Sequence, residues 1–282
     1  MKTGVLVTTL LFVALSSAAY AEERIASFNL GSLDTLDALG ASEQVVGVPK
    51  QSLPDYLSRY DDEAYTDIGG LRSPDLEALA ASEPSLILYT GRQGDWEAEL
   101  EAIAPLLDTG MEGDDYLAAF DDNVRRIAGQ IGAEERAEEA LEALHADIES
   151  QRQALDESLR VLVVTHNDGK LGLNTSPVVH EVLGLETLEM PDSVTSVKRG
   201  NRTFTPLTMA AVGEIHPDVL LVIDRSAAIG NEPADSATLE QALAEAGASD
   251  TRLVMLSPKL WYLSGGGLQS LELQIDEVVE AL

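Results

Sequence analysis

Apolar residues recur with helical spacing over one uninterrupted stretch, residues 133–158. The apolar positions, at intervals of three, four or seven residues, are Ala137, Leu141, Leu144, Ile148 and Leu155. One stripe of this helix therefore faces a partner, while its other faces are charged. At about 1.5 Å per residue it would span roughly 39 Å, the width of a small domain. The pattern predicts a long helix that links two lobes; the alternative is a long surface helix within one domain.

Short apolar runs separated by helical patterns precede this stretch. Ile25–Phe28, Gln44–Val48 and Leu86–Tyr89 are predicted strands, with helices between them. Such alternation is typical of βαβ units with a parallel sheet. The polar segment Pro54–Gly70 is predicted to be irregular and to lie on the surface.

The same alternation starts again after the predicted linking helix. Val161–Val164 and Val219–Ile223 are predicted strands, and a helix is predicted to begin at Thr205–Pro206, as one does at Ser73–Pro74 in the first half. The chain is therefore predicted to be an α/β protein with two Rossmann-like lobes, each with a parallel sheet, joined by one long rigid helix. The predicted domains are a first lobe at 22–132, the linking helix at 133–158 and a second lobe at 159–282.

Two arginines occupy matching places in the two halves. Arg92 follows Pro84 by eight residues and Arg225 follows Pro217 by eight residues, each with a predicted strand in between. Ligands of open parallel sheets bind at the carboxyl ends of the strands, where both arginines fall. The spacing predicts a pair of positive groups across one cleft; a structural role for each arginine is the alternative.

The first 21 residues have the features of a secretory signal peptide. Lys2 supplies the positive start, and Val5–Leu15 is an apolar run too short to cross a membrane. Ala19 and Ala21 are the small residues that signal peptidase requires just before its cleavage site, so the mature chain is expected to start near Glu22. The chain contains no cysteine, which excludes disulfides, thiolate metal sites and lipidation of a cysteine at the new N-terminus. These features predict a soluble protein of the periplasm.

The net charge of −31, from 49 acidic and 18 basic residues, limits the partners of the chain. It excludes general nucleic-acid binding and makes an anionic membrane an unfavourable partner. Because basic residues are scarce, any local group of them calls for a functional reason.

Several segments, taken together and in order, resemble a known family. They are Asn29–Gly40, Gly69–Leu71, Thr90–Gln93, Val179–Gly184, Ile223–Arg225 and Trp261–Leu268. Over nearly all of its length after residue 21, the chain resembles the class III periplasmic binding proteins of ABC importers, whose two lobes are joined by one rigid helix. The nearest likeness is to the iron-siderophore group, and within it to the subgroup that binds ferric catecholates of the petrobactin type.

The resemblance implies capture of a ferric siderophore between the lobes and its delivery to an inner-membrane ABC permease. A ferric catecholate is a compact polyanion, which suits the forked, permanently charged donors of Arg92 and Arg225. By the same resemblance Gln93, Trp261 and Tyr262 belong to the binding site. Tyr262 corresponds to a tyrosine that can ligate Fe(III), since phenolate is a hard oxygen donor. Packing beside Trp261 under the last helix is the alternative role for Tyr262.

The chain departs from that subgroup at one loop. In the subgroup a histidine of the second lobe completes the iron shell, but here the corresponding loop, predicted to be structureless over Thr195–Thr205, has Lys198, Arg199 and Arg202 instead. These three bases are predicted to bind the anionic ligand, so the ligand is expected to differ from that of the subgroup. The histidines interpreted as structural or solvated are His145, His166, His180 and His216.

Importers of this class are expected to dock through one surface carboxylate on each lobe. Glu77 lies seven residues before Pro84, where the first carboxylate is expected. The position seven before Pro217 is Ala210, so the second contact is missing or has moved to Glu214. A plain solvated helix residue is the alternative role for Glu77. The implied receptor is a monomer without an intrinsic cofactor.

The sequence favours a binding protein over an enzyme. None of the hydrolase, P-loop, zinc-protease or dinucleotide-binding motifs is present. The run Gly265–Gly267 precedes a helix and could cradle a phosphate, but it follows a loop and is better explained by a tight turn beside the cleft. Haem or a cobalamin is the alternative ligand.

Overall fold

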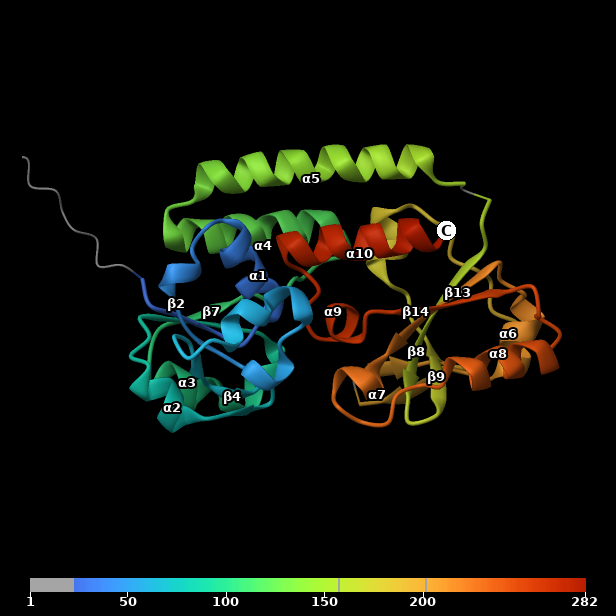
Figure 1. The fold of residues 1–282 in the computed structure, drawn as a ribbon, viewed down its shortest axis with the longest axis horizontal. Helices are drawn as coiled ribbons and strands as arrows, with labels where there is room; N and C mark the ends of the chain where they lie inside the picture. The colour runs from blue at the N-terminus through green and yellow to red at the C-terminus, as the bar shows by residue number, and fades with distance from the viewer. Residues whose placement is uncertain (1–22, 157, 201) are drawn as a thin grey trace, which may run out of the picture.

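The computed structural model describes residues 23–156, 158–200 and 202–282, so the predicted signal peptide lies outside the described residues. Two α/β lobes stand side by side, and the long helix α5 (Glu134–Ala154) passes over both (Figure 1). The first sheet lies within residues 22–132 and the second within 159–282.

The first lobe is built on a parallel sheet with the strand order β3-β2-β1-β6-β7. Its strands are β1 (Ile25–Ser27), β2 (Val45–Val48), β3 (Thr66–Asp67), β6 (Leu86–Tyr89) and β7 (Leu106–Asp108). Its α-helices are α1 (Leu30–Ala38), α2 (Leu76–Ala81), α3 (Glu97–Glu101) and α4 (Tyr116–Ile131). The central strand β1 is fully buried, because apolar side chains cover both faces of the sheet.

The second lobe has a mixed sheet with the strand order β12-β9-β8-β13-β14. Its strands are β8 (Val161–Asn167), β9 (Lys170–Leu173), β12 (Pro206–Leu207), β13 (Val219–Asp224) and β14 (Arg252–Leu256). Strands β8, β13 and β14 are parallel, but β9 and β12 are antiparallel to their neighbours, unlike the predicted parallel sheet. The reason is local: Asp168 and Gly169 have φ values of 49° and 73°, which return the chain as a two-residue hairpin turn.

The second half also contains a π-turn and five α-helices among the described residues (Figure 1). They are the π-turn η5 (Val178–Val182), α6 (Met209–Ile215), α7 (Arg225–Ala228), α8 (Ser236–Glu245), α9 (Pro258–Tyr262) and α10 (Leu268–Ala281). The proline pairs do not begin helices as predicted. Ser73–Pro74 forms the short strand β5, which pairs with β4 (Gly69–Gly70), and α2 begins after Asp75. Likewise α6 begins after Thr208, whose side chain caps it, and not at Thr205–Pro206. Both helices begin where a side-chain acceptor lies next to the first free backbone amides.

The linking helix is shorter than its predicted range of 133–158. It ends at Ala154 because Leu155 adopts an extended backbone, with φ −75° and ψ 145°. The predicted stripe is buried at Ala137, Leu141, Leu144 and Ile148. These residues join a core that also includes residues from both lobes, so α5 is packed along its length.

The last helix does not belong to the second lobe alone. Helix α10 lies beneath α5 and packs against both α1 and α5 (Figure 1). Its buried residues Leu271 and Ile275 join the core that includes Leu39 of the first lobe and Leu221 of β13. The two halves therefore share a continuous apolar core under the linking helix.

Residues 54–70 are more ordered than predicted. They include the 3₁₀ turn η3 (Asp55–Asp61) and the edge strand β3, and Leu57 and Tyr60 are fully buried. The Tyr60 hydroxyl donates to Asp37 on α1 at 2.9 Å. The sequence did not indicate this packing, because the two buried side chains are three residues apart in a segment of mainly polar and charged residues.

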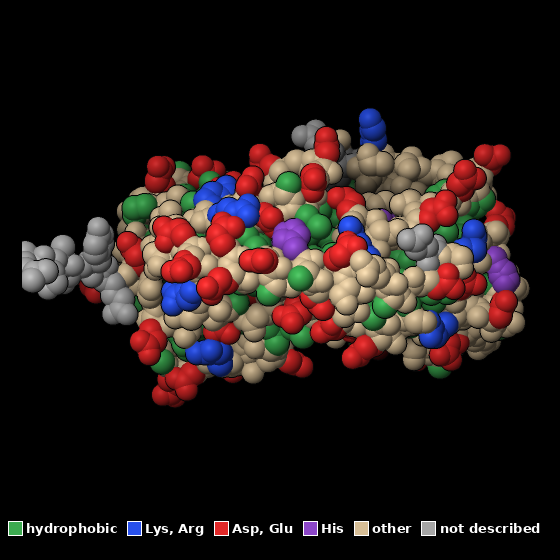
Figure 2. All heavy atoms as spheres, turned by 90° about the horizontal axis from the view of Figure 1, so that it is seen from above, with side chains coloured by type: hydrophobic (Ala, Val, Ile, Leu, Met, Phe, Trp, Pro, Cys, Tyr) green, Lys and Arg blue, Asp and Glu red, His purple; other side chains and the backbone are tan. Residues whose placement is uncertain are grey.

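Acidic side chains are spread over the face above α5, where Lys and Arg are fewer (Figure 2). Within the described ranges, no helix is both long enough and apolar enough to cross a membrane.

Candidate functional site

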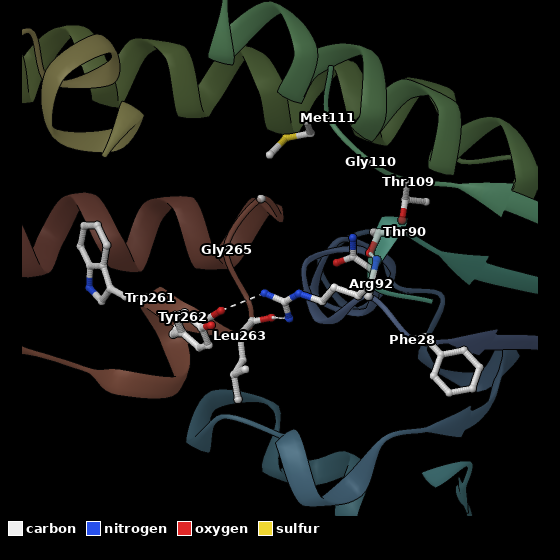
Figure 3. Close-up of a pocket in the computed structure, with 12 residues that line it drawn as sticks. Phe28, Thr90, Arg92, Thr109, Gly110, Met111, Trp261, Tyr262, Leu263 and Gly265 are labelled. Atoms are coloured by element: carbon white, nitrogen blue, oxygen red, sulfur yellow. Dashed lines mark hydrogen bonds between the residues drawn. The ribbon is translucent and has the colours of Figure 1, made fainter. Parts of the chain in front are cut away.

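A cavity of about 280 Å³ lies between the two halves of the molecule (Figure 3). Its first-half wall follows β1, β6 and β7, and its second-half wall is the segment from α9 to α10. The lining residues are Phe28, Asn29, Thr90, Arg92, Thr109, Gly110, Met111, Trp261, Tyr262, Leu263, Gly265 and Gly266. The first-half group follows the carboxyl ends of parallel strands, where ligands of such sheets bind.

Arg92 reaches from the first lobe to the backbone of the second half. It lies in the 3₁₀ turn η4 (Gly91–Trp96), which Thr90 caps by accepting from the Arg92 amide. Its guanidinium donates to the carbonyl oxygens of Tyr262 at 2.9 Å and Leu263 at 3.4 Å (Figure 3). Desolvation between the halves lowers the pKa of Arg92, and the charge of Arg72 lowers it further. A guanidinium remains charged despite such a shift.

Arg225 approaches the same tyrosine from the second lobe. It is the first residue of α7, directly after β13, and is partly exposed. Its Nε donates to the Tyr262 hydroxyl at 2.7 Å, and its guanidinium lies 5.4 Å from the centroid of the tyrosine ring. Its Nη1 donates to the side-chain oxygen of Asn167.

The structure brings the two predicted arginines together at Tyr262. Arg92 donates a hydrogen bond to the backbone oxygen of this tyrosine, and Arg225 donates one to its hydroxyl. Arg225 does not line the cavity itself and lies beyond the tyrosine ring. Neither guanidinium forms an ion pair with a described carboxylate, so both charges are available to an anionic ligand.

The other predicted residues of this wall have different positions. Trp261 lines the cavity, is partly buried and donates from its indole to Glu277 at 2.6 Å. Gln93 does not line the cavity: it is fully buried, accepts from the Thr90 amide and donates to the Leu71 carbonyl. Gln93 therefore holds the turn that carries Arg92, and its amide does not line the cavity.

The predicted basic loop is a β-hairpin. Strands β10 (Val197–Arg199) and β11 (Arg202–Phe204) pair antiparallel, and Gly200 has a φ of 62° that suits the turn. The prediction of a structureless loop was wrong, because charge and glycine content do not exclude a two-stranded hairpin. Lys198 is exposed and does not line the cavity, and the side chains of Arg199 and Arg202 lie outside what the structure describes.

The two candidate docking carboxylates lie on different lobes. Glu77 is in the first turn of α2 and Glu214 is near the end of α6, and both are exposed. The Glu214 carboxylate accepts from the Ser193 hydroxyl at 2.9 Å.

The histidines bind neighbours away from the cavity. His145 pairs with Asp121, His166 with Asp224 and His216 with Asp250, and His180 contacts the Leu185 carbonyl. In the ranges that the structure covers, no group of three His, Cys, Asp or Glu residues could hold a metal ion.

Sequence reasoning missed the residues that follow β1 and β7. Asn29 follows β1 and caps α1 by accepting from the Gly31 and Ser32 amides. Thr109, Gly110 and Met111 follow β7 and complete the cavity wall. The rule that located Arg92 after β6 applies equally to these strands, so their position after a strand was the available signal.

The glycine run 265–267 lies at the wall of the cavity, where its backbone closely approaches the backbone of α1. Gly266 has a φ of 90°, and a Cβ at Gly31 would lie 2.7 Å from the Gly265 oxygen. A Cβ at Gly267 would lie 2.1 Å from the Gly31 oxygen. The run therefore allows the tight turn that its composition predicted, and it also lets α1 touch the segment before α10.

Comparisons with known proteins agree with this architecture. A family model described as periplasmic binding protein matches residues 25–251. The petrobactin-binding protein YclQ of Bacillus subtilis is 30% identical over 269 residues, or 92% of this chain and 82% of that protein. Its crystal structure matches with a TM-score of 0.81, covering 92% of this chain and 91% of that chain.

A second solved structure is similar to the same extent. The iron uptake ABC transporter substrate-binding protein PiuA of Streptococcus pneumoniae is 30% identical, with a TM-score of 0.80 and coverage of 92% of this chain and 93% of that chain. The family match spans most of the chain, and both relatives share the two-lobed architecture over nearly all of it. The chain belongs to the periplasmic binding protein family.

Proposed function

We propose that this protein binds a ferric siderophore, of the catecholate type, between its lobes and delivers it to an ABC permease of the inner membrane. The observation that carries the proposal is the convergence of two guanidinium groups, one from each lobe and both without a described carboxylate partner, on Tyr262. The names of the similar proteins, a petrobactin-binding protein and an iron uptake binding protein, support it.

The chemistry of the ligand fits these groups. A ferric catecholate is a polyanion whose oxygens accept paired hydrogen bonds from guanidinium groups. The iron would be held mainly by the siderophore, and the Tyr262 hydroxyl offers one hard oxygen donor where the complex leaves a position open. Met111 and Leu263 supply apolar surface in the cavity for the catechol rings. The exposed Lys198, with Arg199 and Arg202 of the same hairpin, would add positive charge for the outer part of the anion.

Delivery requires export and docking. The first 21 residues carry the features of a signal peptide, which would direct the mature protein to the periplasm. Glu77 and Glu214 each present an exposed carboxylate, one on each lobe, for basic groups of the permease. The protein would act as a monomer, since one molecule contains both walls of the cavity. Its relatives are binding proteins, in keeping with capture and release of a ligand without chemical change.

Fluorescence titration tests the proposal because Trp261 lines the cavity. Ferric catecholates with one, two and three catechol groups should quench the emission of the wild type. Arg92→Ala and Arg225→Ala should each weaken binding by about 2 to 5 kcal/mol, as expected when a partner of a buried charged contact is removed. Insensitivity to all ferric catecholates, with a response to haem or cobalamin, would contradict the proposal.

A second variant in the same titration tests direct ligation. Tyr262→Phe keeps the ring under Arg225 and the carbonyl that binds Arg92 but removes the hydroxyl. If this hydroxyl ligates iron, the variant should lose more affinity for a bis-catecholate complex, which leaves coordination positions open, than for a tris-catecholate complex. Equal losses for the two complexes would limit Tyr262 to a hydrogen-bonding role.

A further inference from the structure

Three consecutive residues where β8 ends, residues 166–168, pair with three consecutive residues where β13 passes into α7, residues 224–226. His166 Nδ1 lies 2.8 Å from the Asp224 carboxylate, and Asn167 accepts from Arg225. The Asp168 amide donates to the Ser226 hydroxyl at 2.9 Å. The side chains thus continue the β8–β13 register, whose last backbone pair is His166 with Asp224. We call these three pairs the β8–α7 ladder.

The ladder forms where the two strands separate. Beyond Asp224 the chain enters α7, and beyond Asn167 it turns through Asp168 and Gly169 into β9. The turn is tied back to β8, because the Gly169 amide donates to His166 Nε2 at 3.1 Å. Asp224 is 1% exposed and also accepts from the Ala227 and Ala234 amides. The rungs on either side of Asn167 are therefore held in place by buried partners.

The central rung determines the direction of the Arg225 guanidinium. Asn167 holds Nη1 on one edge, which leaves Nε facing the Tyr262 hydroxyl at 2.7 Å. An amide oxygen is a neutral acceptor, so this contact orients the guanidinium without cancelling its charge. A carboxylate at the same place would orient it equally well but would form an ion pair. The choice of acceptor therefore affects charge as well as geometry.

We propose that Asn167 is a positioning residue for ligand capture, which aims Arg225 at the site beside Tyr262 while leaving its positive charge for the anionic ligand. This role rests on the proposed function. It predicts that an Asn167 variant that no longer orients Arg225 and a variant that neutralises Arg225 weaken ligand binding to different extents.

The test compares Asn167→Ala and Asn167→Asp with the wild type. Asn167→Ala should weaken binding of a ferric tris-catecholate about three- to tenfold, as expected for one lost hydrogen bond. Asn167→Asp should weaken it more than about tenfold and should flatten the dependence of affinity on salt, because Arg225 is neutralised. Asn231→Asp adds the same charge at an exposed position near the end of α7 and should leave affinity and salt dependence close to wild type.

A measurement without ligand separates this inference from the proposed function. In the nitrogen-15 spectrum of the free protein, the Arg225 Nε–H resonance, assigned by its loss in Arg225→Ala, should be sharp in the wild type and in Asn167→Asp but broadened in Asn167→Ala. An unchanged resonance in Asn167→Ala, or wild-type affinity in both Asn167 variants, overturns the inference while the proposed function stands. Failure of the wild type to bind any ferric catecholate refutes the proposed function itself.

Discussion

Asp34 is a buried carboxyl group that caps a helix far away in the sequence. It lies on α1 and is fully buried. Its two oxygens accept from the Gln269 and Ser270 amides at the start of α10, each at 2.7 Å, and from the Tyr56 hydroxyl at 3.1 Å. Burial raises the pKa of Asp34 to about 7, although these donors oppose the shift. The capping of α10 therefore depends on a residue that titrates near neutral pH.

This pKa predicts how Asp34 affects stability. Between pH 4 and 7 the folded protein holds a proton on Asp34 that the unfolded chain releases. Its stabilising contribution is therefore complete below about pH 3.8 and falls by about 1.4 kcal/mol per pH unit until the pH passes 7. Urea unfolding should show that the stability of the wild type relative to Asp34→Asn declines over this range.

A second helix cap serves as the control for Asp34. Asp235 caps α8 by accepting from Thr238, which lowers the pKa of Asp235. The contribution of Asp235 to stability has the opposite pH dependence: it is present above pH 3.8 and is lost as the pH falls below that value. A difference between wild type and Asp34→Asn that does not vary between pH 4 and 8 would contradict the assignment.

At the scale of elements, α1 and the start of α10 approach more closely than side chains permit. The contact is between backbones, at Gly31 on one side and Gly265 and Gly267 on the other. The same two elements are joined by Asp34, and the Leu268 amide donates to Thr35 at 3.4 Å. Helix α1 of the first lobe and α10 therefore form one unit, although more than 200 residues separate them in sequence.

A pair of glycine substitutions tests this unit. Gly31→Ala places a Cβ 2.7 Å from the Gly265 oxygen, whereas Gly129→Ala, within α4, places one where no atom lies within 4 Å. Alanine is the better helix former by about 1 kcal/mol, so Gly129→Ala should raise the thermal midpoint. Gly31→Ala should lower it, because the backbones must separate. A rise in both variants would show that the close contact is not needed.

At the scale of the whole molecule, long polar side chains join the two halves. Arg92 donates to the carbonyls of Tyr262 and Leu263, and Lys259 of α9 donates to the Leu53 carbonyl of the first lobe at 2.9 Å. An anionic ligand that binds Arg92 would compete with these carbonyls. Ligand capture and the spacing of the lobes would therefore be coupled through the Arg92 side chain.

Distance measurements test the role of Arg92 in the free protein. The chain has no cysteine, so Glu77→Cys and Glu214→Cys allow one spin label on each lobe. Arg92→Ala should broaden the distance distribution between them, because hydrogen bonds from a charged group, each worth about 1.5 to 3 kcal/mol, are lost. Arg72→Ala removes a neighbouring charge and should leave the distribution unchanged. Identical distributions in wild type and Arg92→Ala would rule out the coupling.

Much of the candidate site was predictable because strand ends are local features. Apolar runs mark the strands, and a residue just after such a run lies at the carboxyl edge of the sheet, which identified Arg92 and Arg225. Gln93 was misjudged because adjacent residues in a tight turn point in different directions, and its amide is used within the turn. Asn167 was missed because β8 continues three residues beyond its predicted end at Val164, so that Asn167 extends the β8–β13 register and lies beside Arg225.

The sequence by itself determined the two α/β halves, the linking helix and the matching places of the two arginines, because periodicity and spacing act over short stretches of chain. Only the tertiary structure decided that Tyr262 lies between those arginines, that Asp34 caps α10 and that the second sheet is mixed. The first two depend on contacts between residues more than 30 positions apart, and the third on a turn of two residues. Neither kind of feature leaves a periodic pattern in the sequence.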